Sequence, residues 1–409
     1  METKLADWIR DTPDGQEADA ILRACVHCGF CNATCPTYQL YGDELDGPRG
    51  RIYQIKQVLE GAAPARATQV HLDRCLTCRN CETTCPSGVQ YGRLLDIGRR
   101  LVDARQPRPA RERLLRGLLR AGLTRRWLFD PAMRLGQALR GLMPPVLRVK
   151  VPPRRAPGRL PARTHARKVL LLNGCVQPAM APSIDAATVR VLDALGVQAL
   201  VEPRSGCCGA IRWHLNAQAQ ALDDLRRNID AWWPHVEAGA EAIVVNASGC
   251  GVMLKDYAHI LRDDPAYAAR AQRIVSLTLD LCEFLERALG AGLPAAFVPA
   301  PARIAFHPPC TLQHGQKLGG RVEALLRRFG AELLPVADAH LCCGSAGTYS
   351  VLQASAAATL RDRKLAELTR AAPEAILSAN IGCLTHLQSG TPVPVRHWIE
   401  WVDQRLARS

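Results

Sequence analysis

Two dense runs of cysteine near the N-terminus constrain this 409-residue chain more than any other feature. Both have the spacing C-x2-C-x2-C-x3-C-P, and they cover Cys25–Pro36 and Cys75–Pro86. This spacing is typical of [4Fe–4S] clusters, because three thiolates of one run can bind three corners of one cube. The fourth cysteine, which precedes a proline, points toward the neighbouring cube. Structural zinc sites are the alternative, but zinc favours two ligand pairs separated by a longer loop.

This pattern predicts two clusters, each bound by three cysteines of one run and the last cysteine of the other. The predicted ligands of cluster 1 are Cys25, Cys28, Cys31 and Cys85. The predicted ligands of cluster 2 are Cys75, Cys78, Cys81 and Cys35. Since eight cysteines already supply every ligand, we interpret His27, inside the first run, as a bystander. Residues 42–51 are predicted to form a turn that leads into a helix beginning near Ile52.

Cysteine usage and hydropathy also indicate the cellular setting. The chain has 17 cysteines, and its start, Met1–Trp8, carries acidic residues and no apolar stretch, so no secretory signal is expected. Cytosolic thiols stay reduced, which argues against a disulfide scaffold and favours metal or redox roles. The chain has no run of 18 or more apolar residues, so no membrane-spanning helix is predicted. We therefore expect a cytoplasmic protein of two or three domains.

Positive charge is concentrated in residues 101–168. The whole chain has a formal net charge of +14, and this segment alone holds 18 Lys and Arg against 3 Asp and Glu. Apolar residues recur at near-helical spacing over Leu114–Leu128, which predicts an amphipathic basic helix followed by a weaker one over Met133–Leu147. Three roles stay open for it: binding an anionic membrane surface, binding an acidic partner, or packing on its own protein.

From residue 168 onward the sequence repeats itself with a period of 135 residues. Each copy has one cysteine, a Cys-Cys-Gly triplet that begins 32 residues later, and a last cysteine. These are Cys175, Cys207, Cys208 and Cys250 in the first copy and Cys310, Cys342, Cys343 and Cys383 in the second. Apolar runs precede the first and last cysteines, as at Val169–Leu172 and Ile304–Phe306, and helical stretches lie between. This alternation predicts βαβ units with a parallel sheet, and cysteines that gather where strands end.

The role of these repeated cysteines stays open at this point. Adjacent cysteines can place two thiolates on one metal centre. The repeats could therefore hold one or two further iron–sulfur clusters or another metal, or one working site and one relic. The remaining interpretation is duplicated buried cysteine without metal. Cys282 has no counterpart in the repeat and is expected to belong to the core.

These features together resemble the iron–sulfur subunits of bacterial glycolate oxidase (glycolate dehydrogenase) along nearly the whole chain. Outside the cysteine runs, the segments that carry the resemblance are Gly47–Ile52, Asn228–Pro234, Leu341–Tyr349 and Arg396–Trp401. The resemblance implies an α/β protein with a helical, ferredoxin-like domain for two [4Fe–4S] clusters over residues 1–100. It further implies a basic linker over 101–167 and two duplicated α/β cysteine-rich (CCG) domains over 168–300 and 301–409.

The same resemblance implies an electron-transfer subunit without catalytic residues of its own. It would receive electrons from flavin-binding subunits, where glycolate becomes glyoxylate, and pass them toward a membrane quinone at the cytoplasmic face of the inner membrane. The sequence has no G-x-G-x-x-G after a strand, no P-loop and no G-x-S-x-G. Iron–sulfur subunits of anaerobic glycerol-3-phosphate or lactate dehydrogenase are the alternatives within this class. A zinc-stabilised nucleic-acid-binding module is the alternative outside it, but nucleic acid is not an expected partner.

The sequence departs from the fuller CCG pattern at one position in each repeat. That pattern ends in C-x-x-C, as in relatives of heterodisulfide reductase, but Ala247 and Asn380 stand where the first cysteine of that pair would be. Each repeat therefore has four cysteines where those relatives have five. This difference puts a noncubane four-iron cluster in doubt.

Overall fold

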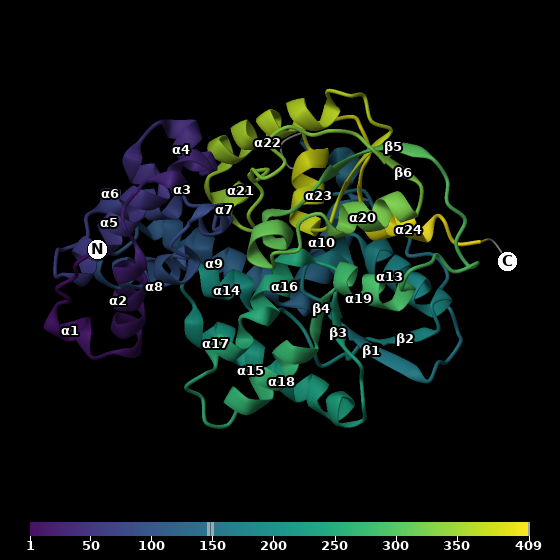
Figure 1. The fold of residues 1–409 in the computed structure, drawn as a ribbon, viewed down its shortest axis with the longest axis horizontal. Helices are drawn as coiled ribbons and strands as arrows, with labels where there is room; N and C mark the ends of the chain where they lie inside the picture. The colour runs from purple at the N-terminus through teal and green to yellow at the C-terminus, as the bar shows by residue number, and fades with distance from the viewer. Residues whose placement is uncertain (145–147, 149–150, 408–409) are drawn as a thin grey trace. The chain divides into compact units, whose positions relative to one another are not determined.

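The structure, a computed structural model, describes residues 1–144, 148 and 151–407, and its chain divides into two compact units (Figure 1). Unit 1 comprises Met1–Gly117 and Asp338–Lys364, and unit 2 comprises Leu118–Ala337 and Leu365–Ser409. Two of the three divisions fall within helices, α9 (Ala110–Thr124) and α22 (Ala354–Thr369), and the third falls between Ala337 and Asp338.

Unit 1 is helical. Besides the first part of α9 and of α22, its elements are α1 (Asp7–Arg10), α2 (Pro13–Ala24), α3 (Phe30–Ala33), α4 (Pro36–Tyr41), η1 (Glu44–Asp46), α5 (Pro48–Leu59), α6 (Arg66–Asp73), α7 (Asn80–Thr84), α8 (Tyr91–Arg105) and α21 (Tyr349–Leu352). The prediction that a helix begins near Ile52 was wrong by about one turn. The helix begins at Pro48, because proline at the first helical position loses no hydrogen bond and its fixed φ already suits a helix.

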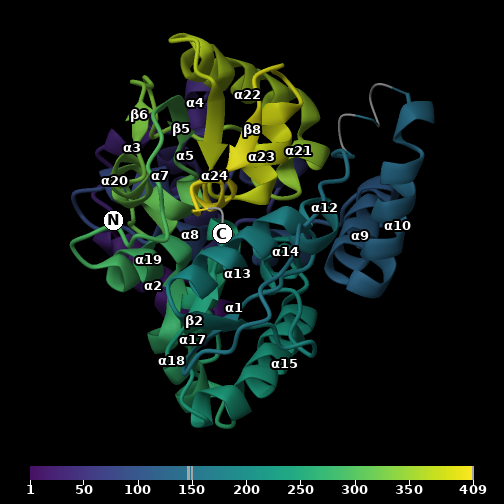
Figure 2. The same cartoon turned by 90° about the vertical axis from the view of Figure 1, so that its right-hand side faces the viewer.

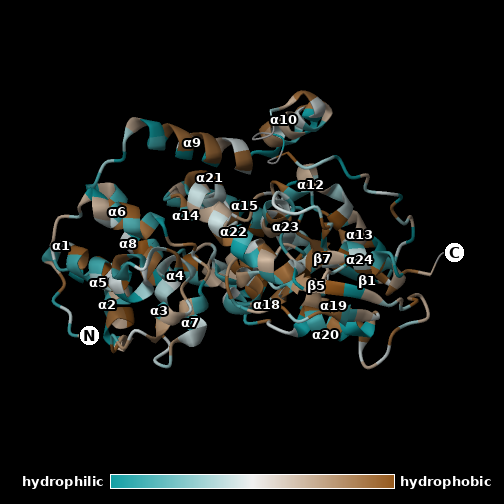
Figure 3. Ribbon diagram, turned by 90° about the horizontal axis from the view of Figure 1, so that it is seen from above, coloured by the Kyte–Doolittle hydropathy of each residue, from teal (hydrophilic) through white to brown (hydrophobic). Residues whose placement is uncertain are grey.

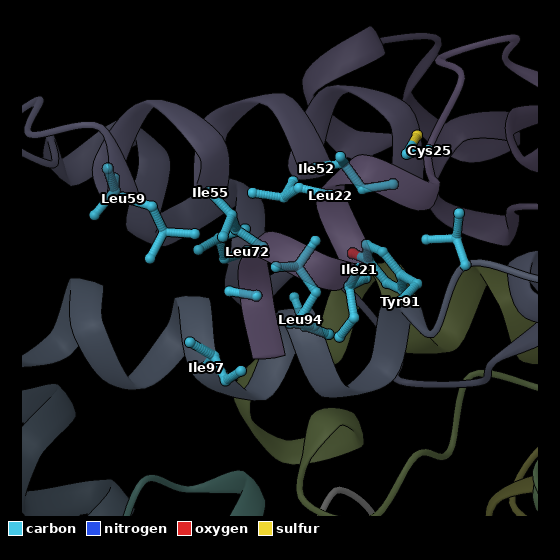
Figure 4. Close-up of a cluster of buried hydrophobic side chains, with 14 of the residues drawn as sticks. Ile21, Leu22, Cys25, Ile52, Ile55, Leu59, Leu72, Tyr91, Leu94 and Ile97 are labelled. Atoms are coloured by element: carbon cyan, nitrogen blue, oxygen red, sulfur yellow. The ribbon is translucent and has the colours of Figure 1, made fainter. Parts of the chain in front are cut away.

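The core of unit 1 lies between α2, α5 and α8 (Figure 4). Leu22, Ile55 and Leu94, one from each helix, are fully buried. A Cβ at Gly98 would lie only 2.6 Å from Ile55 Cγ1, so the glycine allows α8 to approach α5 closely. This packing fixes the helices from which the two cysteine loops extend.

Unit 2 contains two four-stranded parallel sheets with the same strand order, β2-β1-β3-β4 and β6-β5-β7-β8. The strands are β1 (Arg167–Leu171), β2 (Val197–Leu200), β3 (Ile243–Val245), β4 (Thr278–Asp280), β5 (Ala302–His307), β6 (Ala331–Leu333), β7 (Ala375–Ser378) and β8 (Val395–His397). The predicted duplicated βαβ arrangement is thus confirmed. In each sheet the order reverses between the two central strands, a position where α/β proteins commonly bind ligands.

Unit 2 also contains helices, most of which connect or follow the strands (Figure 2). They are α10 (Arg126–Ala138), η2 (Arg140–Leu142), α12 (Gln177–Met180), α13 (Pro182–Ala194), α14 (Ala210–His214), α15 (Gln218–Glu237), α16 (Ser248–Lys255), α17 (Tyr257–Ile260), α18 (Ala268–Leu277), α19 (Leu281–Leu289), the π-helical turn η3 (Thr311–Gly315), α20 (Arg321–Arg328), α23 (Ile381–Gln388) and α24 (Trp398–Asp403). The first sheet packs on α15, whose Trp232 is fully buried in the core with Ile243 of β3.

The basic segment forms two helices whose bounds differ from the prediction. The first, α9, ends at Thr124 instead of continuing to Leu128, and α10 spans Arg126–Ala138 instead of beginning at Met133. The sequence pattern hid this break because the apolar spacing continues across Arg125. The predicted second helix also included residues 145–147, which lie outside the described residues.

One face of α10 and the turn after it expose large apolar side chains. Trp127, Leu135 and Leu142 are 73%, 61% and 85% exposed. Figure 3 shows the apolar residues of α9 and α10 in brown. Elsewhere on α10, Gln137 Nε2 donates a hydrogen bond to the Ala179 oxygen of α12, 3.3 Å away. Across the part of the chain that the structure describes, every helix is too short or too polar to cross a bilayer.

Candidate metal centres

The two N-terminal cysteine runs fold into loops with the same backbone pattern. Two residues after the first cysteine, His27 and Thr77 have φ values of 59° and 54°. Four residues after it, Gly29 and Arg79 have φ values of 87° and 59° and immediately precede the short helices α3 and α7. These left-handed residues turn the chain sharply, so that the thiols of one run face the same point. His27 thus has a backbone role in the loop, and its ring lies 6.1 Å from that of Tyr53.

The structure brings together the four thiols predicted for cluster 1. Burial raises the pKa of Cys31 to about 11, and the neighbouring Cys25, Cys28 and Cys85 contribute to that increase. All four line one pocket of about 440 Å³. Cys85 belongs to the second run, so the crossed arrangement is present. We call these four residues the first quartet; Cys28 is its exposed member.

The thiols predicted for cluster 2 form a second quartet. Burial raises the pKa of Cys81 well above its usual value, with contributions from Cys78, Cys75 and Cys35. All four line a pocket of about 300 Å³. Three of them are buried and Cys78 is partly buried. Four thiols that converge on one point can bind a metal centre and release their protons as they do so, so the geometry of both quartets suits a metal centre.

Sequence reasoning missed a buried arginine beside the second quartet. Arg51 lies on α5 with no exposed surface. Burial alone would lower the pKa of its guanidinium, but the neighbouring Cys75, Tyr91 and Cys35 raise it overall. The segment containing Arg51 was interpreted only as a turn before a helix. The one indication in the sequence that Arg51 matters was its place in Gly47–Ile52, a segment that carries the family resemblance.

In the first repeat, the structure brings together all four predicted cysteines. A hydrogen bond with Cys207 and burial raise the pKa of Cys175. The hydrogen bond with Cys207 lowers the pKa of Cys208, but contact with Cys250 and burial raise it overall. The thiols therefore form a continuous row. Cys175 follows β1 and Cys250 follows β3, the two strands at which the sheet order reverses, so this row lies where such folds bind ligands.

Buried polar groups hold the Cys-Cys-Gly turn of the first repeat. Asn228 donates from Nδ2 to the Cys207 oxygen at 2.8 Å, and Tyr257 donates to the Cys208 oxygen at 3.0 Å. The backbone N–H of Gly209, which has a φ of 92°, lies 3.4 Å from Cys207 Sγ.

The cysteines of the second repeat belong to different units of the structure. In unit 2, Cys310 and Cys383 are buried just beyond the ends of β5 and β7. In unit 1, the Gly344 N–H lies 3.4 Å from Cys342 Sγ, and Gly344 has a φ of 85°. The two Cys-Cys-Gly turns therefore have the same local geometry.

The structure also places the two residues that depart from the fuller CCG pattern, Ala247 and Asn380, and the unrepeated Cys282. Ala247 is buried before α16, and Asn380 Nδ2 lies 4.0 Å from Cys383 Sγ. Cys282 is fully buried near the start of α19, which agrees with its expected place in the core.

Two protein families match the cysteine-containing regions of the chain. The family described as "4Fe-4S dicluster domain" matches residues 21–89. The family described as "Cysteine-rich domain" matches twice, over residues 169–255 and 304–388. The chain therefore carries a domain for two [4Fe–4S] clusters followed by two cysteine-rich domains. The thiol donors of the two quartets fit these clusters, because such clusters are held by four cysteine thiolates each.

Among individual proteins, the chain is 53% identical to the "Glycolate oxidase iron-sulfur subunit" of Escherichia coli over the full length of both. It is 30% identical to the "Probable glycolate oxidase iron-sulfur subunit" of Bacillus subtilis, over 90% of this chain and 89% of that protein. It is 29% identical to "Lactate utilization protein A" of Geobacillus thermodenitrificans, over 58% of this chain and 99% of that protein.

Proposed function

Because the chain belongs to the family of glycolate oxidase iron–sulfur subunits, we propose that it receives electrons from a flavin-bearing partner that oxidises glycolate to glyoxylate. We further propose that it passes them toward a membrane quinone and oxidises no substrate by itself. The observation that carries this proposal is the pair of crossed thiol quartets in unit 1. Within the complex, the chain is an oxidoreductase subunit that binds iron–sulfur clusters and transfers electrons.

The residues of unit 1 would bind and insulate the clusters. We propose that Cys25, Cys28, Cys31 and Cys85 bind one cluster and that Cys35, Cys75, Cys78 and Cys81 bind the other. When bound, these clusters supply one-electron transfer, which a flavin can feed because it divides a two-electron oxidation into single electrons. Around the second quartet, buried side chains exclude water and hydrogen-bond donors reach Cys75 Sγ, and both effects set a cluster's reduction potential.

The test uses the complex purified without oxygen, the chain together with its flavin-bearing partner. We expect brown protein, at least about eight iron atoms per chain, and loss of the broad absorption near ~400 nm when glycolate is added. The chain alone should show no reduction with glycolate. Turnover of glycolate by the isolated chain, or colourless protein containing zinc, would contradict the proposal.

Lactate is the second candidate substrate of the complex, since relatives named lactate utilization protein A align with part of the chain. Those matches cover 58% of this chain, against full-length coverage for the glycolate oxidase relative. We therefore propose glycolate. Adding lactate and glycerol 3-phosphate to the same complex in separate assays distinguishes the three, and faster reduction with either would reassign the substrate.

We also propose that the four cysteines of the first repeat, Cys175, Cys207, Cys208 and Cys250, bind a further metal centre. Contact along the row of thiols and its location at the sheet ends support this. For the second repeat we propose the corresponding role for Cys310, Cys342, Cys343 and Cys383, which rests on the shared pattern and on the similar Cys-Cys-Gly turns.

For the exposed apolar face of α10 we propose an anionic membrane surface as the partner. Trp127, Leu135 and Leu142 supply apolar area, and Trp favours the interface between lipid and water. Exposed Arg125 and Arg134 adjoin them, in a segment with 18 basic and 3 acidic residues. This combination of an apolar face and flanking arginines is typical of helices that lie in an anionic interface.

Flotation with vesicles tests this assignment. We expect the complex to float with vesicles containing phosphatidylglycerol, to bind pure phosphatidylcholine less, and to dissociate as salt screens the charges. The double variant Trp127→Ser/Leu142→Ser should weaken binding at least about tenfold, whereas Val298→Ser, an exposed apolar residue elsewhere in unit 2, should not. Normal flotation of the double variant would contradict the lipid assignment, and loss of the flavin-bearing partner instead would show that the face binds protein.

A further inference from the structure

Charged and hydrogen-bonding groups are distributed unequally around the two quartets of unit 1. Beside the second quartet, Arg51 is completely buried and donates three hydrogen bonds: to the His71 oxygen at 2.7 Å, to Thr37 Oγ1 at 3.1 Å and to Asp46 Oδ1 at 3.3 Å. A second buried guanidinium, that of Arg99, donates to the Cys75 oxygen at 2.7 Å. Two cations are thus held against the loops that carry these thiols.

One buried carboxylate does not neutralise this positive charge. Asp46 is fully buried and pairs with Arg51 and also with Arg74, whose Nη1 lies 2.7 Å from Asp46 Oδ2. Together with Arg99, three guanidinium groups therefore accompany Asp46. Arg79, which lines the pocket, and Glu82, which is coupled to Cys81, add one charge of each sign. The surroundings of the second quartet keep a net positive charge.

The sulfurs of the second quartet also meet hydrogen-bond donors. The buried Tyr91 hydroxyl donates to Cys75 Sγ at 3.7 Å, and the Thr77 N–H donates to the same sulfur at 3.4 Å. Thr37 Oγ1 lies 3.3 Å from Cys35 Sγ, accepts the hydrogen bond from Arg51, and itself donates to the Asp46 backbone oxygen at 2.8 Å. Arg51 therefore orients a hydroxyl that touches a proposed ligand.

The first quartet has a different environment. The guanidinium of Arg49 is electrostatically coupled to Cys31, but its side chain is 34% exposed and pairs with Glu44 at 2.6 Å. Water and this carboxylate both screen its charge. Asn32 Oδ1 lies 4.0 Å from Cys31 Sγ. This oxygen is an acceptor and cannot donate a hydrogen bond to the sulfur.

We propose that Arg51, acting as a positioning residue with the Tyr91 hydroxyl, makes the centre at the second quartet easier to reduce than the centre at the first. Reduction adds one negative charge, which a buried cation stabilises more than an exposed, paired one because the interior screens less. Hydrogen bonds to cluster sulfurs raise the potential further. The first electron then rests at the second quartet. The inference rests on the proposed function only in requiring a cluster at each quartet.

Redox titration of the anaerobic complex, followed by electron paramagnetic resonance, is the test. Cys28→Ser and Cys78→Ser first assign each signal to its quartet. Arg51→Met should lower the equilibrium constant for reduction at the second quartet about tenfold, or about 59 mV for one electron, and Arg51→Lys should restore part of it. Tyr91→Phe should lower it about threefold. Arg49→Met, two residues away on the same helix, is the matched control and should leave the second quartet unchanged.

Each outcome decides the matter. A selective shift at the second quartet in Arg51→Met and Tyr91→Phe supports the inference. Equal potentials in the unchanged complex, or variants that shift both centres alike, overturn it. If Arg51→Met loses iron, Tyr91→Phe and Arg51→Lys decide, since both preserve the packing more closely. Absence of two cluster signals in the unchanged complex would instead contradict the proposed function, so the two failures are distinguishable.

Discussion

The N-terminal quartets and the cysteine row of the first repeat bring four thiols together in two different ways. Each quartet takes three thiols from a single short loop, turned by left-handed residues such as His27 and Thr77. The row in the first repeat takes its thiols from three separate segments: the loop after β1, the loop before α14 and the first turn of α16. The first construction is local, and the second depends on the whole sheet.

This difference indicates what holds each site in place. Left-handed residues other than glycine make these short loops strained, and thiol–metal bonds offset that cost, so metal binding and folding should be coupled there. The row of the first repeat lies on a sheet with its own core, and Asn228 and Tyr257 already hold its Cys-Cys-Gly turn. Its geometry should persist without metal.

The largest expected effect comes from breaking the crossed ligation. Cys85→Ser should remove or alter the cluster at the first quartet, although the other cysteines of its run belong to the second quartet. Cys35→Ser should do the reverse. Because a missing thiolate leaves a cluster with three protein ligands, we expect about four iron atoms fewer per chain and glycolate-dependent reduction near background. Iron and sulfide quantitation with electron paramagnetic resonance measures this. If Cys85→Ser altered the signal of the second quartet, the crossed assignment would be wrong.

The next effect tests the row of the first repeat. If the row binds iron, the original chain should contain more than about eight iron atoms. Cys207→Ser should bring that number down toward about eight and leave both N-terminal signals unchanged. Amide exchange across β1 and β3 should change little, because the sheet forms without the metal. An iron content of about eight in both the original chain and the variant would show that the row is structural.

The sequence predicted the local construction far better than the tertiary one. The spacing of the cysteines alone led to the crossed quartets that the structure brings together, and the apolar runs led to strands in both repeats. Arg51 could not be predicted, because arginine is usually exposed and its partners, Asp46, Thr37 and His71, come from separate segments. The break between α9 and α10 escaped for a related reason: a continuous apolar pattern does not reveal where a helix ends.

A smaller effect concerns how the sheet-based region holds together. His397 of β8 is fully buried, its Nε2 donates to the Asn246 oxygen of the first repeat at 2.9 Å, and its Nδ1 accepts from the Ile399 N–H at 3.2 Å. Burial lowers its pKa to about 4, whereas the unfolded value is about 6.5. Between these values only the unfolded chain binds the proton, so stability falls as pH falls, by up to about 1.4 kcal/mol per unit.

The variant His397→Gln should remove that dependence. Urea unfolding of the original chain and the variant at pH 7.5 and 5.5 measures the difference. The comparison between chains matters because Asp185, whose burial raises its pKa to about 6, changes stability in the opposite direction over the same range. Identical pH dependence in the two chains would mean that His397 does not link the repeats in this way.

The smallest expected effect isolates a cysteine that belongs to neither construction. Cys282 is fully buried at the start of α19, where its backbone N–H donates to Asp280 Oδ1 at 3.1 Å. Cys282→Ala keeps that backbone bond but removes the thiol and its own hydrogen bond to Asp280, so we expect a loss of about 1–2 kcal/mol of unfolding free energy and no change in iron. Urea unfolding and iron quantitation, with Cys207→Ser measured in parallel, separate packing from metal binding. A loss of iron in Cys282→Ala would place this residue among the metal-binding cysteines, and the contrast between the two regions would then need a third kind of site.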